Sequence, residues 1–258
     1  MGEHGTWFDF LNRYDGWRSF QHWAGDHLGR KGDLPILGRS EFTLTHVVIA
    51  ILVVLLATLG ALSFFRGVKT ADGGVVPPRA MNVRHFFEYL AESVYGMAEG
   101  ALGEDNAPRF FPLIGALWLF ILFSNLIGLI PGFIAPTDTL KTNVGIAVMV
   151  FLLTHYFGVR KHGLAYFKHF LGPVWWLIPL MLPIELIGHI ARPVSLSMRL
   201  MGNMLADHKV VIAFFALVPF IVPVPFMLLG VLVCVIQAFV FCLLTMVYIG
   251  MAVEHADH

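Results

Sequence analysis

Charge is scarce in this chain. Only 13% of its 258 residues are Asp, Glu, Lys or Arg, and the 17 basic side chains cancel the 17 acidic ones. Because there is no excess of positive charge to neutralise phosphates, the composition gives no indication of a nucleic-acid partner. Cysteine is scarce too. Cys234 and Cys242 both lie in the last apolar run, where burial in lipid or a helix bundle argues against a disulfide.

Several signals that would point to other classes of protein are missing. The first residues lack the basic start and apolar core of a cleaved signal peptide, so we expect the first apolar run to act as an uncleaved anchor. No internal repeat is evident. There is no glycine-rich loop ending in Lys-Ser or Lys-Thr, so we expect no nucleotide site in this chain. We also expect no cofactor and no bound metal.

Hydrophobic residues are abundant instead. They make up 57% of the chain, and the mean hydropathy is +0.75. Several apolar runs reach the roughly 20 residues that a helix needs to cross a bilayer. We therefore predict an all-α polytopic membrane protein with five transmembrane helices, one interfacial amphipathic helix and two long tilted C-terminal helices. The predicted segments are a tail over 1–42, a first span over 43–65, an interfacial helix over 82–102, a hairpin over 109–159, and two long helices over 174–253.

The two long runs at the C-terminal end are too long to stand upright. Straight helices over 174–219 and 220–253 would be roughly 65 and 50 Å long at 1.5 Å per residue. They must tilt strongly, bend, or break at prolines such as Pro183, Pro193 and Pro219.

The basic residues predict the orientation. Most of those outside the spans fall in segments 66–109 and 160–172, whereas the turn over 131–142 carries only Lys141. Because cytoplasmic loops are enriched in Lys and Arg, this places the N-terminus in the periplasm and the C-terminus in the cytoplasm.

Ionisable residues gather in one of the long apolar runs, over 185–209. A charge at the centre of a bilayer costs at least ~2.5–3.5 kcal/mol on insertion scales, so such a group calls for water, partners or a transported ion. Arg199 is the most informative, because arginine keeps its proton even when it is desolvated. A lone arginine in a span is usually an anchor that reaches to the interface, but Arg199 lies in the middle of the run. The ionisable members of the run are Glu185, His189, Arg192, Arg199, Asp207, His208 and Lys209.

On a helix these residues form one polar stripe. Ser195, Arg199, Asn203 and Asp207 are spaced by four residues and share a broad face. Glu185 lies about 21 Å from Arg199 along the axis, and His208 about 13 Å to the other side. Titratable groups thus flank a fixed cation in both directions, which predicts two proton paths that Arg199 separates.

Further polar residues are weaker candidates. His189 could join the path of Glu185, and Gln237, in an otherwise apolar run, could continue the other path. Each also has a purely structural interpretation. Gln237 could make an interhelical hydrogen bond, and Asn125 could serve packing between helices. Arg192 could reach to the interface or pair with Glu185.

Three sequence segments carry a resemblance to a known family. They are Pro193-Val-Ser-Leu-Ser-Met-Arg-Leu-Met-Gly-Asn-Met, Gln237-Ala-Phe-Val-Phe, and Ser124-Asn-Leu-Ile-Gly-Leu-Ile-Pro in the hairpin. The chain resembles the a subunit of F-type rotary ATP synthases over nearly all of 43–253. The resemblance implies that the chain has no catalytic site of its own and lies in the bacterial inner membrane. The implied partners are a ring of c subunits, b-type peripheral stalk subunits, membrane lipid and, indirectly, the catalytic ATPase sector.

The resemblance also implies roles for individual residues. Arg199 would face the carboxylates of the rotating c ring. Asn203, His208 and Gln237 would line a half-channel from the periplasm, and Glu185 would line one to the cytoplasm.

The chain departs from the family at one place on the periplasmic side. The family often pairs an ionisable residue at the place of His208 with another on the last helix, where this chain has Gly230. We hypothesise that Asp207 supplies the missing carboxylate, in space that Gly230 leaves open. Alternatively, Asp207 and His208 simply cap the polar end of the stripe.

Two competing functions remain open from the residues alone. A stand-alone ion-coupled secondary transporter would usually show two related halves, and none is visible. A haem-binding electron carrier is suggested by the twelve histidines, and visible absorbance of the purified chain would reveal it.

Overall fold

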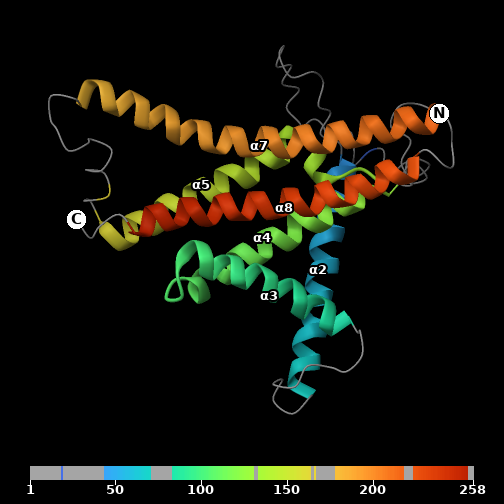
Figure 1. Cartoon of the computed structure of the whole chain (residues 1–258), viewed down its shortest axis with the longest axis horizontal. Coiled ribbons are helices and arrows are strands. Elements are labelled where there is room, and N and C mark those ends of the chain that lie inside the picture. The colour runs from blue at the N-terminus through green and yellow to red at the C-terminus, as the bar shows by residue number, and fades with distance from the viewer. Residues whose placement is uncertain are drawn as a thin grey trace.

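A computed structural model describes residues 19, 44–70, 83–130, 133–163, 166, 178–217 and 223–254 (Figure 1). Every regular element in these ranges is a helix, which confirms the all-α prediction for this part of the chain. Apart from Ser19, the predicted N-terminal tail lies outside the described residues. The helices are α2 (Leu44–Thr70), α3 (Val83–Leu102), α4 (Ala107–Gly128), the short 3-10 helix η3 (Pro136–Asp138), α5 (Leu140–His162), α7 (Ile178–Leu217) and α8 (Pro223–Glu254).

Three of the described helices are long and apolar enough to cross a membrane. They cover Ala107–Gly128, Leu140–His162 and Pro223–Val253. The apolar part of α2, His46–Leu62, is shorter, and α7 carries the ionisable stripe. The structure therefore supports a polytopic membrane protein, and the count of five spans stays a prediction.

The two C-terminal helices are exceptionally long. α7 has 40 residues and continues through Pro183 and Pro193, and α8 has 32. A straight helix of 40 residues measures about 60 Å, twice the hydrocarbon core of a bilayer. Figure 1 shows α7 and α8 running lengthwise beside each other, with α2 running across their direction. Of the three expected alternatives, a break does not occur at Pro183 or Pro193, which leaves tilting or bending of α7 as predictions, and Pro219 lies outside the described residues.

The main core lies where α3, α4, α5 and α8 meet, and two buried leucines of α7 also belong to it. Phe110, Ile114 and Phe241 are almost completely buried there. The ring of Phe110 also meets that of Phe157 edge-on, with centroids 4.9 Å apart, which joins α4 to α5. These apolar contacts hold the hairpin against α8 and so fix the platform on which α7 lies.

Helix α3 has two unlike faces. Val94 and Ala98 are buried against the core, whereas Glu92 and Glu99 are exposed. This amphipathic pattern is typical of a helix at a membrane surface, and the interfacial position of α3 stays a prediction.

Candidate functional site

The predicted polar stripe lies on a single continuous helix, α7. Glu185 and His208 belong to this helix, but the arrangement of their side chains lies outside the described residues. Their roles therefore stay predictions. Arg199, Asn203 and Asp207 follow one another at intervals of four residues along the helix, so they stand roughly one above the other.

Arg199 is exposed, on a side of α7 that the rest of the described chain leaves uncovered. A β-carbon added at Gly188 or Gly202 would meet no atom of the described chain within 4 Å. Arg199 therefore borders a surface that another helix could approach closely, because small side chains let backbones come together. The exposed small residues on this side are Gly188, Ala191, Ser195, Gly202 and Ala206.

One turn beyond Arg199, α7 and α8 are joined by a hydrogen bond. The side-chain amide of Asn203 donates from Nδ2 to Oε1 of Gln237 at 2.7 Å. Gln237 is only 4% exposed. The structure thus brings together two residues predicted on different helices. The bond matches the structural interpretation of Gln237, and it also places two amides that can exchange hydrogen bonds with water beside the arginine.

Asp207, one further turn along α7, is half-buried. On the same stretch Met204 packs with Ala135 of the hairpin turn and Cys234 of α8. The expectation of open space at Gly230 is wrong. A β-carbon there would lie 2.7 Å from Cδ2 of Leu129, because the side chain of Leu129 reaches over from the end of α4.

The hairpin turn holds a buried polar cluster that the sequence predicted only through Asn125. Thr137 Oγ1 donates to Asn125 Oδ1 at 2.7 Å, and Asn143 Nδ2 donates to the carbonyl of Thr137, also at 2.7 Å. All three residues are fully buried, and η3 contacts α7. The signal in the sequence was the polar run Pro136-Thr-Asp-Thr-Leu-Lys-Thr-Asn between two apolar segments.

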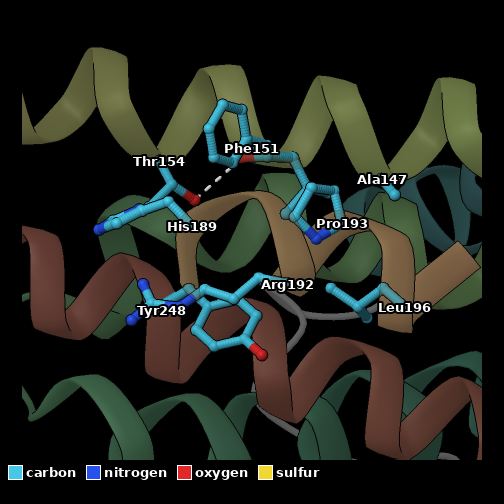
Figure 2. Close-up of a pocket in the computed structure, with 9 residues that line it drawn as sticks. Ala147, Phe151, Thr154, His189, Arg192, Pro193, Leu196 and Tyr248 are labelled. Atoms are coloured by element: carbon cyan, nitrogen blue, oxygen red, sulfur yellow. Dashed lines mark hydrogen bonds between the residues drawn. The ribbon is translucent and has the colours of Figure 1, made fainter. Parts of the chain in front are cut away.

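A second group of polar side chains lies on the other side of Arg199, in a small pocket between α5, α7 and α8 (Figure 2). The guanidinium carbon of Arg192 lies 5.0 Å from the centre of the Tyr248 ring. Arg192 is therefore half-buried against α8 through a cation–π contact. The ring of His189 meets that of His155 with centroids 5.2 Å apart, and Thr154 lies beside them. Ser195 is exposed and lies outside this group.

The pocket with His189 and the half-buried Asp207 lie toward opposite ends of the fold. His162, at the end of α5, contacts the carbonyl of Val253 near the end of α8, Nε2 to oxygen 2.9 Å. The pocket with His189 lies toward this end, and Asp207 lies toward the hairpin turn. The last turn of α5 carries Arg160, Lys161 and His162.

The geometry restricts what the stripe can do chemically. His189 lies about 15 Å from Arg199 along the helix axis, and Asp207 about 12 Å from it in the other direction. Histidine and aspartate side chains can bind and release a proton, whereas arginine keeps its proton. The arrangement therefore offers proton-binding groups on either side of Arg199, with a fixed positive charge between them. That these groups relay protons stays a prediction.

Known proteins are similar to this chain in sequence over most of its length. The family model described as ATP synthase A chain matches residues 46–250. ATP synthase subunit a 1 of Syntrophotalea carbinolica is 48% identical over 237 residues, which cover 92% of this chain and 97% of that protein. ATP synthase subunit a of Geobacter sulfurreducens is 55% identical over 174 residues, 67% of this chain and 76% of that protein. The subunit a of Trichlorobacter lovleyi is 47% identical over 83% of this chain and 86% of that protein.

Proposed function

This chain belongs to the ATP synthase subunit a family, and on that premise we propose that it conducts protons to and from a rotating ring of c subunits through two offset half-channels. The observation that carries the proposal is the setting of Arg199. It is a permanent cation on an uncovered, small-residue face of α7, one turn from the Asn203–Gln237 hydrogen bond and between two groups of titratable side chains.

The proposed cycle follows from electrostatics. A cation near a carboxylate favours its ionised form, so a ring carboxylate that arrives beside Arg199 gives up its proton toward the cytoplasmic path. It takes up another from the periplasmic path before it turns into the lipid. Asp207, His208, Asn203 and Gln237 serve the periplasmic path, with Asn125 as a supporting residue. Glu185 and His189 serve the cytoplasmic path, and Arg192 and Ser195 support it.

The energy that one proton releases on crossing the membrane is small, so several protons are needed for each ATP. A unit charge that crosses about 100 mV releases only ~2.3 kcal/mol. The chain therefore acts as a stationary, non-catalytic subunit, and rotation of the ring transmits the work to a catalytic sector elsewhere in the complex.

The proposed orientation is supported by the basic end of α5. Lys and Arg are enriched on the cytoplasmic side of membrane proteins, and the last turn of α5 carries Arg160 and Lys161. The pocket with His189 then lies toward the cytoplasm, and the hairpin turn toward the periplasm. With five spans, the N-terminus is periplasmic and the C-terminus cytoplasmic, in the inner membrane of a bacterium.

The uncovered surfaces suit the proposed partners. The face of α7 with Arg199 fits the c ring, because its small residues permit close helix contact. On α2, Ile51, Leu55 and Leu59 are more than half exposed, which suits lipid or the membrane helices of b-type stalk subunits. The alternative of a stand-alone secondary transporter is set aside, because the chain belongs to the subunit a family.

Replacement of the arginine tests the proposed function. We expect Arg199→Ala to abolish ATP-driven proton pumping in inverted membrane vesicles, while the complex still assembles. Passive proton leak should persist or rise, because nothing then keeps the two half-channels apart. Ser197→Ala is a suitable control, because Ser197 is buried on the same helix and bonds to its own backbone at Val194. Normal pumping by Arg199→Ala would overturn the proposal.

A further inference from the structure

His155 of α5 is the feature that the proposed function leaves unused. Its half-buried ring lies 5.2 Å from that of His189, centroid to centroid, at 71°. His189 already belongs to the proposed cytoplasmic path. His155 therefore brings a second titratable ring from a different helix into contact with that path.

The contacts of His155 continue away from α7. The ring of Tyr166, which follows α5 in the chain, meets His155 edge-on with centroids 5.9 Å apart. Gly158 makes room for it, since a β-carbon at Gly158 would lie 2.5 Å from the Tyr166 ring. Tyr166 is half-buried, so this row of three rings leads from α7 across His155 to the side of the last turns of α5.

A backbone contact fixes the tautomer of the neutral His155 ring. Nδ1 lies 2.9 Å from the carbonyl oxygen of Phe151. A carbonyl can only accept, so Nδ1 donates its hydrogen there, and Nε2 of the neutral ring is an acceptor. Histidine held in this way can take up one proton at Nε2 and release it again, which is the behaviour of a proton-holding residue.

We propose that His155 is a proton-accepting residue of the cytoplasmic half-channel, placed between His189 and Tyr166. A proton leaves the ring of His189 and binds Nε2 of His155, which becomes an imidazolium. It then passes to water beside Tyr166, and His155 returns to its neutral form. Arg192 of α7 and Tyr248 of α8 line the same pocket as His189, and Arg160, Lys161 and His162 form the basic last turn of α5. This inference rests on the proposed function.

Substitutions at position 155 separate a titrating role from a packing role. We expect His155→Phe, which keeps a ring, and His155→Gln, which keeps hydrogen bonding, both to slow passive proton conduction severalfold in membranes stripped of the catalytic sector. His155→Glu should retain most of the conduction, because a carboxylate also takes up and releases protons. The neighbouring Tyr156→Phe is the matched control, since Tyr156 is 56% exposed, and it should conduct like the parent.

Either of two results would overturn the proposal: conduction by His155→Phe at the parental rate, or conduction by His155→Gln as fast as by His155→Glu. If His155→Phe does not assemble, a cysteine at 155 gives a second measurement, in a background where Cys234 and Cys242 are replaced. A small charged thiol reagent added on the cytoplasmic side should react there and block conduction, and failure to react would contradict the proposal.

Different results would overturn the role of His155 and the proposed function of the chain. Normal pumping by Arg199→Ala would remove both. Loss of pumping in Arg199→Ala, with parental conduction in His155→Phe, would remove only the role of His155.

Discussion

The two ends of the polar stripe on α7 are built from different chemistry. Toward the hairpin turn, an acid and neutral amides and hydroxyls dominate: Asp207, the Asn203–Gln237 bond and the buried Thr137–Asn125 bond. Toward the other end, Arg192 stacks on Tyr248 and His189 meets His155. The described polar contacts near the hairpin turn therefore involve a carboxylate, amides and hydroxyl groups, whereas those near the other end involve a guanidinium and aromatic rings, with Arg199 between them.

This difference has a physical consequence for a proton path. A carboxylate raises the local affinity for protons, whereas a nearby guanidinium lowers it. The proton-motive force still decides the direction of flow. In the proposed half-channels, we expect the unlike ends to adjust how readily protons are taken up on one side and released on the other, and the following predictions test that difference in order of decreasing effect.

The largest effect is expected from removing the acid. Asp207→Gly should cut ATP-driven pumping sharply, because the inlet then lacks the carboxylate that Gly230 does not supply. Gly230→Glu in the same chain should restore part of the rate, and more of it with Leu129→Ala, because Leu129 occupies the position of the new side chain. Pumping at the parental rate by Asp207→Gly would mean that Asp207 only ends the polar stripe. His208 would then be the only titratable residue of the periplasmic path.

A smaller effect is expected at the amide pair. Because Asn203 and Gln237 share a hydrogen bond, Asn203→Leu and Gln237→Leu should each slow pumping, and the double variant should be little worse than either single one. The measurement is a double-mutant cycle on pumping rates in inverted vesicles. Independent, fully additive losses would show that the bond in the structure has no part in proton conduction.

How much of this site the sequence predicts depends on whether a residue's partner lies on the same helix. The stripe on α7 follows from spacing alone, because Arg199, Asn203 and Asp207 recur every four residues. The bond to Gln237, the clustering of Thr137 with Asn143 and the ring contact between His155 and His189 each need two helices in their packed positions. No local pattern contains that information.

Gly230 shows the same limit from the opposite direction. A glycine in a sequence indicates a missing side chain, but not what fills the space. Here Leu129, from the end of a helix about a hundred residues earlier in the chain, lies over it. Likewise, α7 continues through Pro183 and Pro193, although proline tends to end or kink a helix.

The smallest effect is expected at the contact between Arg192 and Tyr248. Tyr248→Leu removes the cation–π contact with Arg192, worth roughly 0.5–2 kcal/mol in proteins, and should lower the thermal stability of the complex slightly and pumping modestly. Tyr248→Phe keeps the ring face and should behave like the parent in both assays. A strong loss in Tyr248→Phe would show instead that the hydroxyl group, and not the ring, is required.

The central claim is that Arg199 separates two aqueous paths that open on opposite sides of the membrane. Its most direct test is side-specific labelling of single cysteines at 185 and 207, with Cys234 and Cys242 replaced, by a small charged thiol reagent. The account predicts reaction at 185 from the cytoplasmic side and at 207 from the periplasmic side. Labelling of both positions from the same side, or of 185 only from the periplasm, would contradict it.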